Sequence, residues 1–166
     1  DADLAETLYS GGVGRELLDI DEKFTKPIVR LMAASQGRLT MDDVGVYLYA
    51  RHAQERNAYI ASINPQMPDG GSGMTNADAQ QVLADAAAHP DAAAFAQIGT
   101  LIDQLREFTI QSRVAAGLLS PADAALWRQQ YAHYVPLRGW DETDHAESIL
   151  DLRGARRGRQ FSVRGK

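Results

Sequence analysis

The chain has 166 residues, of which 45% are hydrophobic and 23% charged, and its net charge is −5 at pH 7. This length suits one domain of ordinary size, and the hydrophobic fraction argues against disorder over most of it. Cysteine is absent, which excludes disulfides, thiolate metal sites and a cysteine nucleophile. No stretch reaches the roughly 18 apolar residues of a membrane span, so we expect no membrane partner.

Charge is divided unevenly along the chain. Residues 151–166 carry six basic residues and one acidic residue, a net charge of +5, whereas residues 1–150 carry −10. The chain begins with Asp1 and stops at Lys166 within a basic pattern. We therefore expect an excerpt of a longer polypeptide, with a helical domain over residues 1–150. Residues 151–166 would be a basic strap or linker that leads to further domains.

Apolar residues recur at intervals of three and four, the pattern of amphipathic helices, so we predict an all-α fold. A short helix is expected over residues 3–9 and a longer one over residues 13–35. The apolar stripe of the longer helix contains Val13, Leu17, Ile20, Phe24, Pro27 and Leu31. Pro27 should kink this helix or split it in two, because its ring removes a hydrogen bond and crowds the preceding turn.

Two long helices are expected to form the centre of the domain. The first should run over residues 41–63 behind an N-cap at Thr40. The second should run over about residues 91–117, and Pro90 suits its first position because proline there removes no helical hydrogen bond.

Shorter helices complete the predicted set. Thr75 should cap a helix that ends near residue 88, and Ser120 should cap one that ends near residue 131. These elements predict an irregular antiparallel helical bundle, followed by an extended basic C-terminal tail.

Asn57 interrupts the apolar stripe of the first long helix, between Ala53 and Ile60. A buried amide needs hydrogen-bond partners, and we expect them in the backbone of an irregular segment such as residues 134–139. This interpretation gives Asn57 a packing role in preference to ligand binding.

The same helix carries the candidates for catalysis, His52, Glu55 and Arg56. The spacing of His52 and Glu55 can place an imidazole and a carboxylate on one metal ion or one proton path. The alternative is a structural cluster that ties this helix to its neighbours, with Arg51 and Glu55 as an exposed ion pair. We favour the structural interpretation, because the remaining histidines lie in no matching motif, and we predict no metal and no cofactor.

A glycine-rich loop precedes the predicted helix at Thr75. The backbone N–H groups of Gly70, Gly71 and Gly73 could bind an anion such as phosphate at this helix start. A P-loop also needs a lysine, which Met74 and Thr75 do not supply. The favoured alternative is a flexible turn followed by an N-cap.

The basic tail allows three interpretations. Its cations could contact the phosphates of a nucleic acid, strap the tail onto the acidic body, or keep a linker soluble. These residues are Arg153, Arg156, Arg157, Arg159, Arg164 and Lys166. We favour the strap or linker, because Phe161 and Val163 offer apolar anchors that an electrostatic arm does not need.

Four stretches carry a resemblance to a known group of proteins. They are YLYARHAQERN at residues 47–57, MPDGGSGMT at 67–75, YAHYVPLRG at 131–139 and FSVRGK at 161–166. Together they resemble the large multi-domain (polyvalent) proteins of tailed phages and integrated elements, which combine helicase-like, methylase-like and other modules. The resemblance implies a helical module of a protein in the bacterial cytoplasm or packaged in a virion, sometimes linked to protection against host restriction.

From these observations we expect a non-catalytic structural or interaction module of a large phage- or prophage-encoded protein. Its partners would be other domains of the parent polypeptide. Two alternatives remain open: a nucleic-acid-associated module that uses the basic tail, and a metal- or acid/base enzyme centred on His52 and Glu55.

Overall fold

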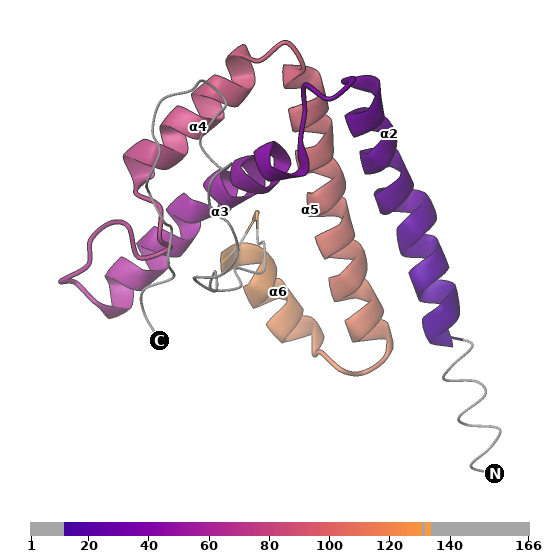
Figure 1. The fold of residues 1–166 in the computed structure, drawn as a ribbon. Helices are drawn as coiled ribbons and strands as arrows, with labels where there is room; N and C mark the ends of the chain where they lie inside the picture. Colours follow the sequence, from indigo (N-terminus) through magenta and orange to yellow (C-terminus); the bar gives the residue numbers. More distant parts are fainter. Residues whose placement is uncertain (1–11, 131, 134–166) are drawn as a thin grey trace, which may run out of the picture.

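The computed structural model describes residues 12–130 and 132–133, and Figure 1 shows their arrangement. These residues form helices joined by short loops, and no strand occurs among them. The predicted all-α fold is therefore confirmed. The expected helix at residues 3–9 and the basic tail at residues 151–166 lie outside the described residues.

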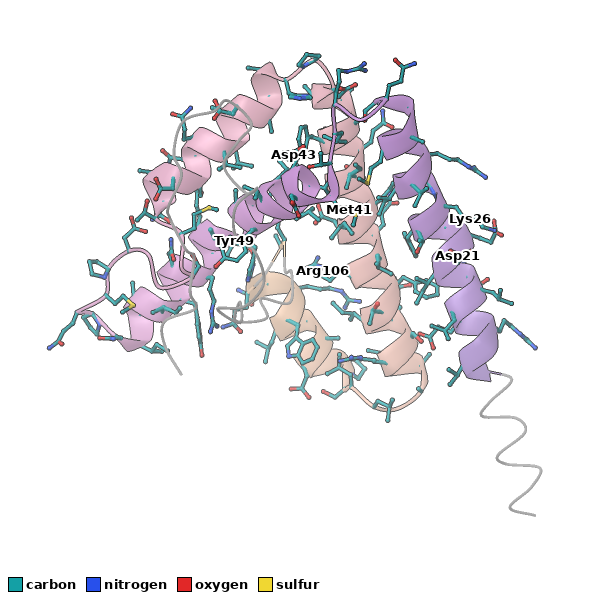
Figure 2. The ribbon with its side chains drawn as sticks, viewed as in Figure 1. Asp21, Lys26, Met41, Asp43, Tyr49 and Arg106 are labelled. Atoms are coloured by element: carbon teal, nitrogen blue, oxygen red, sulfur yellow. The ribbon has the colours of Figure 1, made fainter. Side chains whose placement is uncertain are left out.

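The first long helix is continuous but contains one wide turn. Residues 12–20 are α-helical, η1 is a π-helical turn at Asp21–Thr25, and α2 follows at Lys26–Ala34. The N–H of Lys26 donates to the carbonyl of Asp21, five residues earlier. Figure 2 shows the two side chains on the outer side of this helix, where they form an ion pair of 3.5 Å.

Two effects were predicted for Pro27, a kink in this helix or a split into two helices. The split is wrong, because the helix is continuous from residue 12 to Ala34. A proline ring clashes with the preceding turn of an α-helix and cannot donate to it. A π-turn holds one more residue per turn, and such wide turns occur inside otherwise regular helices. The wide turn at Asp21–Thr25 therefore lies at the place where the ring of Pro27 would clash with a regular α-helical turn.

The first of the two central helices, α3, spans Met41–Ile63, as predicted. The side chain of Thr40 accepts from the N–H of Asp43 at 3.1 Å, and the Asp43 carboxylate accepts from the N–H of Thr40 at 2.8 Å. This reciprocal capping box satisfies amide groups that a helix start leaves without partners. Figure 2 shows Asp43 and Met41 at this end of α3.

The remaining helices are α4 at Asn76–Ala88, α5 at Ala92–Ala115 and α6 at Pro121–Gln130. Pro90 is not the first residue of α5, because Asp91 occupies the N-cap position. The N–H of Asp91 donates to Nδ1 of His89, and its carboxylate accepts two bonds from Arg38 at 2.8 and 3.0 Å. These contacts hold Asp91 outside the helix, which begins one residue later.

Two groups of buried apolar side chains form the core. One lies where α3, α4 and α5 meet and contains Leu39, Val44, Leu48, Ala86, Phe95 and Ile98. The other lies between α3 and α4 and contains Val46, Ala50, Ala53, Met74, Ala79 and Val82. The first long helix lies along α5, where the rings of Phe24 and Phe108 meet edge to face at 5.7 Å.

Replacing Phe95 with alanine should lower the free energy of unfolding by about 3–5 kcal/mol, since a buried ring leaves a cavity behind. Its ring is 1% exposed and packs against Tyr47 and His89. Urea unfolding followed by circular dichroism measures the change. Leu126→Ala is the control, because Leu126 is 59% exposed. Equal effects of the two substitutions would contradict the core described above.

Candidate functional site

Polar side chains from three parts of the chain meet on one side of α3. We call this site the polar junction; it consists of Arg51, His52, Glu55, Asp103 and His133. The first three come from α3, Asp103 comes from α5, and His133 follows α6. The junction contains His52 and Glu55, the two residues that the sequence analysis selected for acid/base or metal chemistry.

Glu55 binds main-chain groups at the junction. Its Oε1 accepts from the N–H of Ala132 at 3.1 Å, and its Oε2 accepts from the N–H of His133 at 3.2 Å. A carboxylate that accepts two backbone N–H groups makes strong, charge-assisted bonds. Glu55 thereby joins residues 132 and 133 to α3.

His52 lies beneath this carboxylate. The residue is 1% exposed, and its Nδ1 is 3.4 Å from Oε2 of Glu55. Burial lowers the pKa of His52, and Arg56 and His133 act in the same direction, whereas Glu55 opposes them. Since the ordinary histidine pKa is about 6.5, the imidazole of His52 is neutral at pH 7.

Arg51 pairs with α5, so the predicted exposed pair between Arg51 and Glu55 is wrong. Its Nη1 donates to the carbonyl of Gly99 at 3.0 Å, and its Nη2 donates to Asp103 Oδ2 at 2.5 Å. The side chain of Arg51 is only 14% exposed. Gly99 makes this approach possible, because a Cβ there would lie 2.8 Å from Nη1 of Arg51. A glycine inside a predicted helix could have indicated such a close contact.

The ring of His133 lies next to both the positive Arg51 and the negative Asp103 of the junction. Its Nδ1 is 2.9 Å from Nη2 of Arg51 and 3.2 Å from each carboxylate oxygen of Asp103. The side chain of His133 is 41% exposed, so this part of the junction reaches the surface.

In this geometry the candidate acid/base groups make contacts within the fold. Both oxygens of Glu55 hold backbone amides, and His52 is buried. The third candidate, Arg56, lies over the ring of Tyr59 at 5.5 Å. Within the described residues, no group of three or more His, Asp or Glu is placed to hold a metal ion. The contacts of the junction join α3, α5 and residues 132 and 133.

Asn57 occupies a second polar site, at the glycine loop. Its Nδ2 lies 2.9 Å from Asp69 Oδ1, the Met74 carbonyl and Asn76 Oδ1, and its Oδ1 accepts from the N–H of Ser72 at 2.7 Å. The packing role expected for Asn57 is therefore present, but the partner is this loop. The segment proposed from the sequence, residues 134–139, lies outside the described residues.

The loop is held to α3 by further contacts. The hydroxyl of Tyr49 donates to the carbonyl of Ser72, and burial raises the pKa of Tyr49 to about 12. Gly71 packs directly on Ile60, since a Cβ at residue 71 would lie 2.6 Å from Cγ2 of Ile60. The loop therefore needs a glycine at this position for packing.

The anion-binding interpretation of Gly70, Gly71 and Gly73 gains no support from the loop geometry. The N–H of Gly70 donates to Asp69 Oδ1 at 2.7 Å, and the N–H of Gly73 donates to the carbonyl of Gly70 at 2.9 Å. Asp69 also accepts from the N–H of Asn76 at the start of α4. A carboxylate of the chain itself thus lies where an external anion would bind.

Comparisons with known proteins gave no match from which a function could be inferred. No family model, curated protein or solved structure matches this chain. Among the described helices, none is long and apolar enough to cross a membrane.

Replacing Asn57 with aspartate should lower the free energy of unfolding at pH 7 by about 2–4 kcal/mol. The shape of the side chain is nearly kept, but the NH2 group that faces three acceptors becomes a charged oxygen. Chemical unfolding of both proteins measures the loss. The control is Asn64→Asp, the same change at the exposed end of α3, which should cost no more than about 1 kcal/mol. Similar losses at the two positions would contradict the role assigned to Asn57.

Proposed function

We propose that this chain is a non-catalytic structural and interaction module of a larger phage- or prophage-encoded protein. The observation that carries the non-catalytic part is the engagement of both Glu55 oxygens by backbone amides. The phage-type parent is supported by the four sequence stretches described above. Such a protein acts in the cytoplasm of a bacterial host or travels in a virion.

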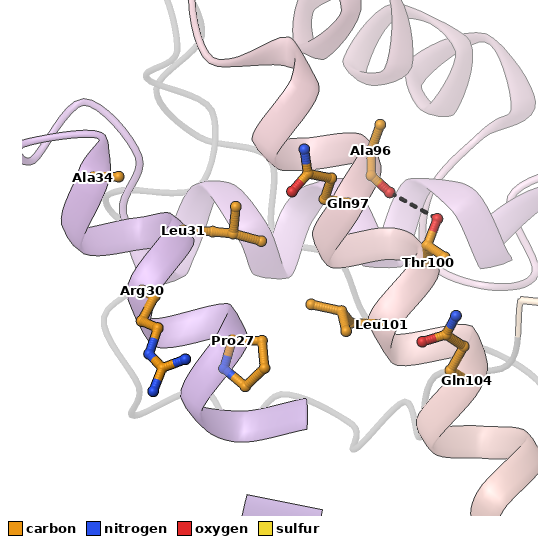
Figure 3. Close-up of a pocket in the computed structure, with 9 residues that line it drawn as sticks. All are labelled: Pro27, Arg30, Leu31, Ala34, Ala96, Gln97, Thr100, Leu101 and Gln104. Atoms are coloured by element: carbon orange, nitrogen blue, oxygen red, sulfur yellow. Dashed lines mark hydrogen bonds between the residues drawn. The ribbon is translucent and has the colours of Figure 1, made fainter. Parts of the chain in front are cut away.

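A groove between α2 and α5 offers the contact surface (Figure 3). Its volume is about 620 Å³, and its lining residues are Pro27, Arg30, Leu31, Ala34, Ala96, Gln97, Thr100, Leu101 and Gln104. Apolar side chains of both helices face the groove, while Arg30, Gln97 and Gln104 supply polar groups. An apolar groove of this kind can receive the apolar face of an amphipathic helix.

The occupant that fits this groove best is an amphipathic helix from another domain of the parent polypeptide. The α2 wall consists of residues at positions i, i+3, i+4 and i+7, so it presents about two helical turns to a partner. Helices that bind in such grooves present apolar residues with the same spacing. Among the described lining residues, Arg30 is the single charged one, so an acidic residue beside the apolar stripe of the partner would complement it.

Expressing this chain together with each flanking region of the parent reading frame tests the proposal. One flanking region should co-purify with the chain, and Ala96→Glu should weaken its binding at least about tenfold through bulk and negative charge in the groove. Ala84→Glu, the same change at an exposed position of α4, should leave binding unaltered. The proposal fails if no flanking region binds, or if Ala96→Glu binds as well as the control.

A nucleic-acid-associated module is the second candidate, because residues 151–166 carry a net charge of +5. If the tail is a strap or linker, the whole chain and a version ending at Leu150 should bind DNA equally weakly at low salt. A tail that contacts phosphates gives the opposite result: micromolar binding by the whole chain alone, which falls steeply as salt is added. Fluorescence anisotropy with a labelled duplex distinguishes these outcomes, and the second would replace the strap interpretation.

A further inference from the structure

The outer side of the first long helix carries a stripe of exposed residues. Figure 1 shows this helix at the edge of the molecule, beside α5. Its inner side packs on α5 through Phe24, which meets Phe108, and through Glu16, which accepts from the hydroxyl of Ser112 at 2.6 Å. The exposed residues of the opposite side, which we call the outer stripe, are Gly14, Leu18, Glu22, Lys26, Val29 and Ala33. Since they follow one another at intervals of three and four, they lie along one side of the helix.

Two large apolar side chains of the outer stripe are open to solvent. Leu18 is 67% exposed and Val29 is 58% exposed. One turn before Leu18, a Cβ built on Gly14 would have no neighbour within 4 Å. Glycine inside a helix costs about 1 kcal/mol relative to alanine, and no contact within the described residues makes use of the open space. The stripe therefore has both apolar surface and room for a second helix to approach closely.

The centre of the outer stripe carries opposite charges. Lys26 forms an ion pair of 3.5 Å with Asp21, which borders the stripe, and its ammonium also donates to the carboxylate of Glu22. Figure 2 shows Asp21 and Lys26 on this outer side. All three side chains are at least 45% exposed. Exposed ion pairs within a helix contribute little to stability, and these charges remain accessible to a partner.

The apolar residues of the stripe match those of a second copy in the antiparallel direction. A twofold axis that crosses the helix pair between residues 23 and 24 places Leu18 of one copy opposite Val29 of the other. The same axis places Gly14 opposite Ala33, so small residues at both ends allow the two backbones to come close. Every contact then occurs twice, as a twofold interface requires.

The same register brings opposite charges together. Lys26 of each copy lies opposite Asp21 of the other copy and one position from its Glu22. A parallel twofold pair would instead place each charged residue beside its own copy, which is repulsive. An antiparallel pair centred on Glu22 would bring the two Glu22 carboxylates together. The charges therefore favour one direction and one register, as charged residues do in coiled coils.

We propose that two copies of this chain associate through their outer stripes, as an antiparallel helix pair over residues 14–33. This pairing runs for about 30 Å at 1.5 Å per residue, so it involves most of the first long helix. The outer stripe faces away from α5, whereas the groove lies between α2 and α5. The pairing therefore stands or fails independently of the proposed partner of the groove.

The mass of the full chain in solution tests the pairing. In sedimentation equilibrium from about 5 to about 500 μM, the average mass should rise from 18.1 kDa toward twice that value. Leu18→Glu should weaken the dimer at least about tenfold, because it places a charge against the apolar side chain of Val29. The control is Leu126→Glu, the same change at an exposed position of α6, which should leave the mass unaltered.

Two charge variants test the direction and register. Lys26→Glu makes the centre of the stripe wholly acidic, and Asp21→Lys combined with Glu22→Lys makes it wholly basic. Neither variant should dimerise alone, because like charges then face each other, but an equimolar mixture of the two should form dimers. Circular dichroism should show that each variant keeps its helices, so recovery in the mixture reports on contacts between copies.

Several outcomes would overturn the pairing. A mass of 18.1 kDa at every concentration would exclude a second copy as the occupant of the stripe. Equal dissociation constants for Leu18→Glu and Leu126→Glu would place the interface elsewhere on the molecule. A mixture of the two charge variants that stays monomeric would contradict the antiparallel register.

Discussion

The attachment of the glycine loop to α3 centres on one buried amide, that of Asn57, with Tyr49 and Ile60 adding further contacts. Both ends of this side chain bind the loop, through the N–H of Ser72 on one side and the Met74 carbonyl on the other. A side-chain amide satisfies a donor and an acceptor at once, which an apolar residue of similar volume cannot do. The loop leads directly into α4, so the amide also places α4 against α3 and closes the second apolar core.

Much of the helical framework could be predicted because its signals are local. Thr40, Thr75 and Ser120 each stand three residues before an aspartate, and all three side chains accept from the N–H of that aspartate. A cap involves only residues within one turn, so the sequence alone contains the whole interaction. The wide turn at Asp21–Thr25 was missed because proline indicates a disturbed helix but not the form of the disturbance.

Only part of the candidate site could be found in this way. The proximity of His52 and Glu55 follows from their spacing on α3, but Arg51 binds Asp103, 52 positions along the chain. The partners of Glu55 are backbone amides at residues 132 and 133, and every residue except proline carries such a group. No residue type marks those two positions, so the sequence could suggest acid/base chemistry at Glu55 but not its role as an attachment point.

The π-turn has a geometric consequence for the first long helix. A turn with one additional residue rotates the side chains of the preceding helical residues by about 100° around the helix axis, relative to those of the residues that follow. The stripe that is continuous in sequence therefore divides into two sectors that face different directions. Val13 and Leu17, in the earlier sector, are 40% and 62% exposed, whereas Phe24 is 6% exposed. Loss of a single residue within Asp21–Thr25 would bring the two sectors back into phase, so the length of this short segment controls which face of the N-terminal half is turned to solvent.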